Sequence, residues 1–186
     1  MVSILSLWLP ILLAAVLVFV ASAVLHMVFK YHQADFKKLP DEDAAMRALR
    51  PLGIAPGDYM MPYSHGAESM RSEEYKKKVQ DGPVAVFTVL PSSAMTSMGA
   101  QLGQWFVYCA VVGVFAAYVA SRTLAPGAEY LSVFRLSGTV AFACYAMGTP
   151  QRSIWYKQNW GTTGRSMFDA LIYSLLTAGA FGWLWP

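Results

Sequence analysis

Long apolar segments alternate with polar ones along this chain. Four apolar segments, at residues 4–29, 102–121, 131–149 and 167–185, carry few charges. An α-helix rises 1.5 Å per residue, so about 20 residues cross a hydrocarbon core of about 30 Å, and each segment is close to that length or longer. The pattern therefore predicts an all-α fold, an integral membrane bundle of four transmembrane helices. Residues 1–29 hold the first helix and residues 102–186 hold the other three.

The first segment resembles a secretory signal peptide in position but differs from one in composition. Residues 1–3 contain no basic residue, and the apolar run exceeds the 7–15 residues of a signal-peptide core. We therefore expect it to be retained as a membrane span.

The overall composition agrees with a membrane protein. Hydrophobic residues make up 56% of the 186 residues and charged residues only 13%, with a net charge of +3. Because Lys and Arg flank the apolar segments, we assign them to contacts with anionic lipid headgroups. The lipid bilayer is the expected partner, and no nucleic acid is expected.

Basic residues also predict the orientation in the membrane. Lys and Arg concentrate in residues 30–83 and 150–166, whereas the opposite side has only Arg122 and Arg135. The positive-inside rule places these two loops in the cytoplasm and both termini in the periplasm.

Residues 30–101 are expected to form a cytoplasmic loop of short helices with no core of its own. One helix is predicted to follow Pro40 and end near Leu49, and another to begin at Ser69 or Ser72. Within the second, Glu73–Lys77 and Glu74–Lys78 have the i,i+4 spacing of ion pairs.

An apolar stretch near 84–91 is too short to span a bilayer, and Pro91 separates it from the next span. We expect an interfacial or re-entrant segment there. A longer, kinked second span is the alternative.

Small residues recur in the apolar segments at the spacing of close helix–helix contacts, which favours a compact bundle. They are Gly99, Gly103, Gly113, Ala117, Ser121, Gly138, Ala141, Gly148, Ser174, Ala178 and Gly182.

Polar side chains inside spans are costly and therefore informative. The predicted orientation brings several to the level of the inner leaflet, where they would form a candidate polar pocket. They are His26, Tyr108, Tyr145, Asp169, Tyr173 and Arg165. Such a pocket would suit proton transfer between His26 and Asp169, or a quinone or lipid headgroup. In the structural alternative, His26 bonds to Ser22 one turn earlier, and Asp169 caps its helix or pairs with Arg165.

A second group, Met60, Met61 and His65, contains ligand types that suit copper. It has no fixed motif spacing, so we prefer interfacial packing and predict no metal site. The sequence also lacks a phosphate-binding loop, a dinucleotide fingerprint, a zinc-protease motif, a nucleophile elbow and a paired-histidine haem arrangement. No cofactor is therefore predicted.

These observations favour a non-catalytic membrane protein, an accessory subunit or small scaffold whose partner is a larger membrane protein. The alternative is a small transporter or membrane enzyme that uses the inner-leaflet site of His26 and Asp169.

Three segments resemble a family of small four-span bacterial inner-membrane proteins. They are YHQADFKKLPDED at residues 31–43, RTLAPG at 122–127 and FGWLWP at 181–186. The resemblance covers nearly the whole chain and implies a bacterial inner membrane. No function is established for that family, so the resemblance carries over no catalytic residue.

Overall fold

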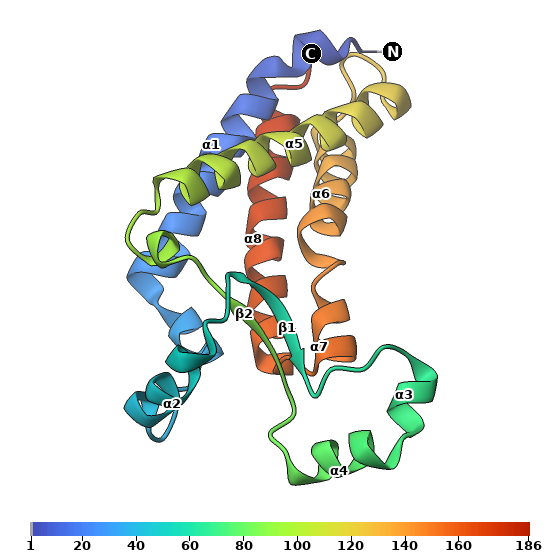
Figure 1. Cartoon of the computed structure of the whole chain (residues 1–186). Helices are drawn as coiled ribbons and strands as arrows, with labels where there is room; N and C mark the ends of the chain where they lie inside the picture. The colour runs from blue at the N-terminus through green and yellow to red at the C-terminus, as the bar shows by residue number, and fades with distance from the viewer. Residues whose placement is uncertain (1) are drawn as a thin grey trace. The chain divides into compact units, whose positions relative to one another are not determined.

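A computed structural model describes residues 2–186, which divide into two compact units (Figure 1). One unit joins the two ends of the chain, Met1–Lys37 and Gly99–Pro186. We call it the helical bundle. The other unit, Lys38–Met98, is called the inserted segment.

Four long helices make up the helical bundle. The first is a continuous helical run that begins as a 3-10 turn and ends as a π turn. Its parts are η1 (Ile4–Leu7), α1 (Trp8–Val24) and η2 (Leu25–Phe29). The other elements are η3 (Tyr31–Asp35), α5 (Gly99–Thr123), α6 (Tyr130–Ala146), α7 (Pro150–Tyr156) and α8 (Trp160–Trp183).

Within residues 2–186, three helical runs are long and apolar enough to cross a membrane. They are Ile4–Phe29, Gly99–Thr123 and Tyr130–Tyr156. These runs indicate a membrane protein by their length and composition, and they agree with three of the four predicted spans. The fourth predicted span lies in α8, which has 24 residues but is not among the three.

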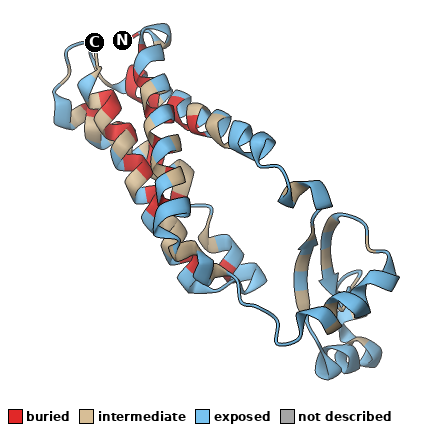
Figure 2. Ribbon diagram, turned by 90° about the vertical axis from the view of Figure 1, so that its left-hand side faces the viewer, coloured by how far each residue is buried: buried red, intermediate tan, exposed pale blue. Residues whose placement is uncertain are grey.

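Small side chains fill the interior of the helical bundle. Helices α1 and α6 each pack against both α5 and α8, and the helices bury Ala15, Ala117 and Ala141 completely. Figure 2 shows the buried residues along the long helices. Large apolar side chains such as Val20 and Phe115 are exposed instead. An exterior of this kind suits lipid, and a small-residue interior lets helix backbones approach closely.

Glycines mark two of these close approaches. A Cβ atom at Gly138 would lie 2.9 Å from Ala178 Cβ, and one at Gly182 would lie 2.6 Å from the ring of Tyr130. The predicted small-residue contacts are therefore present between α6 and α8. In contrast, a Cβ atom at Gly99 or Gly103 would meet nothing within 4 Å.

The inserted segment consists of short helices and one β-hairpin. Its helices are α2 (Glu42–Leu49), η4 (Arg50–Leu52), α3 (Ala67–Arg71), α4 (Glu73–Asp81) and η5 (Ser92–Met95). Strands β1 (Gly57–Met61) and β2 (Ala85–Val89) pair antiparallel, with Tyr59 opposite Phe87. No residue of this segment is buried.

The predicted helices of the inserted segment are confirmed in outline. Asp41 caps α2 by accepting a hydrogen bond from the Ala44 amide, and Ser72 caps α4 by accepting one from Tyr75. The ion pair of Glu74 with Lys78 is present at 2.6 Å.

Two details of the inserted segment differ from the sequence prediction. Glu73 pairs with Lys76, three residues on, and not with Lys77. Ala85–Val89 form strand β2 and α5 begins only at Gly99, so the second span does not extend into this stretch. An interfacial or re-entrant position of the stretch stays a prediction. The inner and outer positions of β2 alternate with period two, which suits a strand, and Phe87 stacks on Tyr59 at 5.7 Å.

Candidate functional site

Two histidines lie together where the first long helix ends. The π turn η2 carries His26, and Lys30 then takes the left-handed conformation, with φ of 53°. This reversal starts η3, which carries His32. The two imidazole rings stack with centroids 4.4 Å apart and an angle of 4° between their planes.

Asp169 of α8 faces both histidines. Its side chain is only 5% exposed, and its Oδ2 atom lies 2.8 Å from His32 Nε2 and 3.9 Å from His26 Nε2. The hydroxyl of Tyr31 donates a hydrogen bond to the other carboxylate oxygen. We refer to His26, His32 and Asp169 as the histidine–aspartate cluster.

The two structural roles predicted for Asp169 are wrong. Asn159 caps α8 by accepting a hydrogen bond from the Gly161 amide. The helix therefore begins at Trp160, earlier than the apolar pattern indicated, and Asp169 lies in its interior. Arg165 pairs with Asp35 instead of with Asp169.

A second set of polar contacts supports His32. Its Nδ1 atom lies 2.6 Å from Asp35 Oδ2, and Arg165 Nε donates to Asp35 Oδ1 at 2.7 Å. Burial alone would raise the pKa of Asp35, but the hydrogen bonds from His32 and Arg165 outweigh it and hold that pKa below its ordinary value. Asp35 is therefore an ionised acceptor at neutral pH.

The ring of His26 is held on its other side. Its Nδ1 atom donates to the backbone carbonyl of Ser22 at 2.9 Å, so the predicted contact one turn earlier is present. The Ser22 hydroxyl in turn accepts a hydrogen bond from Trp105 Nε1 at 2.8 Å. The His26 side chain remains 50% exposed.

The predicted pocket residues thus separate into two groups. His26 and Asp169 come together, and Arg165 joins them through Asp35 and His32. Three tyrosines form an aromatic group with Trp105 instead, with ring centroids between 5.5 and 6.3 Å apart. They are Tyr108, Tyr145 and Tyr173. Tyr108 donates to the carbonyl of Cys144 at 3.0 Å, whereas the buried Tyr173 hydroxyl has no hydrogen-bond partner among the described residues.

Sequence reasoning did not include Tyr31, His32 and Asp35 in the site. The spacing of His32 and Asp35, three residues apart, was the available signal, because side chains at that spacing meet on a helical turn. No pattern in the sequence indicated that this turn would lie against Asp169.

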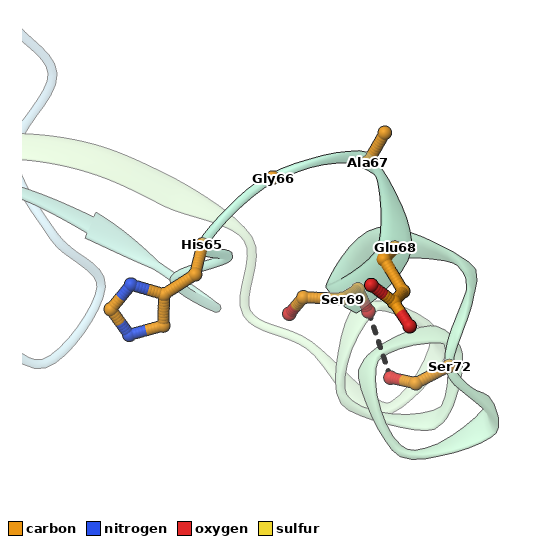
Figure 3. A pocket seen from close by; sticks show the side chains of 6 residues that line it. All are labelled: His65, Gly66, Ala67, Glu68, Ser69 and Ser72. Atoms are coloured by element: carbon orange, nitrogen blue, oxygen red, sulfur yellow. Dashed lines mark hydrogen bonds between the residues drawn. The ribbon is translucent and has the colours of Figure 1, made fainter.

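The weak metal candidates of the inserted segment are not brought into one site. Met60 and Met61 are neighbours on β1, so their side chains point to opposite faces. His65 packs edge-on against Tyr63 at 4.9 Å. It lines a surface depression together with residues 66–69 and Ser72, where the Ser72 hydroxyl donates to the Ser69 carbonyl (Figure 3). Most of these lining residues are exposed.

Comparison of the chain with protein-family models, with curated proteins and with solved structures found no match.

Chemically, the histidine–aspartate cluster offers two imidazole nitrogens and one carboxylate oxygen to a common point. These three groups can hold a proton or a divalent cation. The ionised Asp35 and the Ser22 carbonyl fix how the two rings are turned.

Proposed function

We propose that this chain is a four-span protein of the bacterial inner membrane that serves as a non-catalytic accessory subunit or small scaffold in a larger membrane complex. The proposal has two parts, the fourth span with its orientation and the contact with a partner.

The arrangement of side chains on α8 supports a fourth span. Its polar residues Asp169, Ser174 and Thr177 are buried, whereas Phe168 and Leu171 are exposed. Mean hydropathy counts both faces equally, so it underestimates how apolar the outer face is. A helix that packs along α1 and α6 with such a face is suited to lipid.

The ends of the chain support an even number of spans. The Gly127 amide, in the α5–α6 connection, donates to the carbonyl of Pro186 at 2.6 Å. Both termini and this connection lie at one end of the helical bundle (Figure 1). With four spans, both termini would lie on the same side, which the positive-inside rule makes periplasmic.

A reporter that is active only in the periplasm tests this orientation. Fused after Pro186 it should be active, and inserted near Arg71 it should be silent. The reverse pattern would contradict the charge argument, and activity at neither or both positions would contradict the even number of spans.

The observation that carries the accessory role is the open start of α5. Gly99 and Gly103 have nothing within 4 Å of a built Cβ atom, whereas Gly113 on the same helix packs against Ile11. Nearby Val107 is 60% exposed. The glycine spacing is that of close helix pairs in membranes, so this face suits a transmembrane helix of a partner protein.

Purification in mild detergent tests the accessory role. We expect a larger membrane protein in stoichiometric amount with the native chain and its loss from the variant Gly103→Leu. Gly179→Leu is the matched control, because Gly179 also lies within a long helix with nothing within 4 Å. A lone chain in several detergents, or equal recovery of the partner with Gly103→Leu, would refute the role.

A small transporter or membrane enzyme is the second candidate, and the approach of His26 to the buried Asp169 favours it. Asp169 accepts a hydrogen bond from Tyr31 and lies within hydrogen-bond distance of His32, which is the reach that proton transfer needs. The surface depression at His65 includes no residue of the cluster and offers it no substrate path, so the accessory role is kept as the first candidate.

A further inference from the structure

The three side chains of the histidine–aspartate cluster point their ligand atoms toward one another. One ligand atom from each of His26, His32 and Asp169 lies within 4.8 Å of the other two. The three residues come from two short turns near the N-terminus and from α8, so only the tertiary fold brings them together.

The hydrogen bonds of the two rings fix which nitrogen faces Asp169. The Nδ1 atom of His26 meets a backbone carbonyl oxygen, and that of His32 meets a carboxyl oxygen of Asp35 that accepts from no other ring among the described residues. Both acceptors require a proton on Nδ1, so in a neutral ring Nε2 carries a lone pair. These lone pairs face Oδ2 of Asp169.

Such an arrangement calls for a proton or a metal cation between the groups. A lone pair 2.8 Å from a carboxylate oxygen is repelled unless a proton or a cation lies between them. A proton would join His32 to Asp169 and leave His26 aside, whereas a metal ion would engage all three ligand atoms.

We infer that His26, His32 and Asp169 form a binding site for a divalent first-row transition-metal ion of the zinc or ferrous class. Two imidazoles and one carboxylate are a ligand set that these ions accept, often with an open position for water or substrate. With metal–ligand bonds of about 2.1 Å, two ligands of a tetrahedral ion lie about 3.4 Å apart. The observed separations of 2.8 and 3.9 Å lie on either side of that value.

The surrounding residues match the supports that metal ligands use. A ligating histidine commonly donates its other ring nitrogen to a carboxylate or a backbone carbonyl, as His32 does to Asp35 and His26 to Ser22. Tyr31 holds the second oxygen of Asp169. The site does not depend on the proposed accessory role, which rests on the start of α5.

Metal titration of the full chain in detergent tests the inference. The protein is stripped with a chelator, and binding of Zn²⁺ is measured by calorimetry and by metal content, with Co²⁺ absorption as a spectroscopic probe. We expect one ion per chain, a Co²⁺ spectrum of low coordination number and a higher thermal unfolding temperature with Zn²⁺. His26→Gln should abolish all three effects.

The choice of variants separates ligand loss from unfolding. His26 is half exposed, so His26→Gln should leave the unfolding temperature of the metal-free protein nearly unchanged. Asp35→Asn should weaken Zn²⁺ binding by about 10–100-fold, because Asp35 supports a ligand without being one. His65→Gln is the control, since this exposed histidine belongs to the inserted segment.

Three results would overturn the inference. The first is no binding by the native chain. The second is binding that persists unchanged in His26→Gln or in His32→Gln, and the third is binding that His65→Gln removes. The first leaves a proton shared between His32 and Asp169 in place of the metal ion. The second and third assign the metal to adventitious surface groups.

Discussion

The helical bundle and the inserted segment differ in the sequence separation of the polar contacts within each of them. In the bundle, His32 approaches Asp169 across 137 residues of sequence, and Arg165 reaches Asp35 across 130. In the inserted segment, the ion pairs join residues three or four positions apart, as Glu74 and Lys78 do. The bundle therefore depends on its tertiary fold, and the helices of the segment depend on local sequence.

Burial explains this difference. The bundle buries whole side chains such as Val18, Val112 and Phe181, whereas no residue of the inserted segment is buried. A unit without a buried core gains little from apolar packing, so caps, ion pairs and one hairpin carry its structure. Polar groups matter in both regions, but only in the bundle are they withdrawn from solvent.

The largest expected effect comes from removing the carboxylate at the centre of the bundle's polar network. In metal-free protein, Asp169→Ala leaves Tyr31 and His32 facing a buried site with no acceptor. Removing one partner of a buried ion pair lowers the free energy of unfolding by roughly 3–5 kcal/mol. We expect a loss of that order in the free energy of unfolding, measured in detergent with a chelator present.

A double-mutant cycle sharpens this prediction. Asp169→Ala and His32→Gln should be coupled by roughly 0.5–3 kcal/mol, because the two side chains are in contact. Asp58→Ala is the control in the inserted segment, where its hydrogen bond to Thr88 is exposed, and it should change stability little. Additive effects of Asp169 and His32 would mean that the network is not a unit, and the contrast between the two regions would fail.

A smaller effect is expected where two helices of the bundle touch. Gly138→Leu inserts a side chain at a point where even a Cβ atom would lie 2.9 Å from Ala178. Overpacking of this kind costs about 1–3 kcal/mol, which thermal unfolding in detergent can measure. Gly103→Leu is the matched variant, because its surroundings are open and leucine favours a helix over glycine. Equal destabilisation by both would show that glycine packing does not distinguish these positions.

The long helices, and the N-termini of α2 and α4, could be predicted because both depend on residues that are close in sequence. Apolar runs of membrane length, and caps such as Asp41 and Ser72, are properties of neighbouring residues. The start of α8 was missed because Asn159 caps a polar first turn, which apolar periodicity does not detect. Strand β2 was missed because a strand requires a partner, and the partner lies in residues 57–61.

The candidate site was predictable only in part. The cost of placing ionisable groups inside apolar segments singled out His26 and Asp169. Their neighbours Tyr31 and His32 lie just outside the first apolar run, so the same criterion passed over them. Their position against Asp169 depends on the left-handed backbone conformation of Lys30. Lysine rarely adopts this conformation, so the sequence did not indicate a turn there.

The smallest expected effect concerns an ion pair on the surface of the inserted segment. The hydrogen bond and charge of Lys78 hold the pKa of Glu74 below its ordinary value of 4.5. The folded helix therefore binds fewer protons there than the unfolded chain, so the pair stabilises α4 above that pH and its contribution is lost as the pH falls through the lowered pKa. Carboxyl ¹³C titration by NMR should show that pKa, and Lys78→Gln should raise it towards 4.5. Lys77→Gln should leave it nearly unchanged, because Lys77 makes no ion pair among the described residues. An equal shift with Lys77→Gln would mean that the general charge of α4, and not the Glu74–Lys78 contact, lowers the pKa, and the local character assigned to this region would then be wrong.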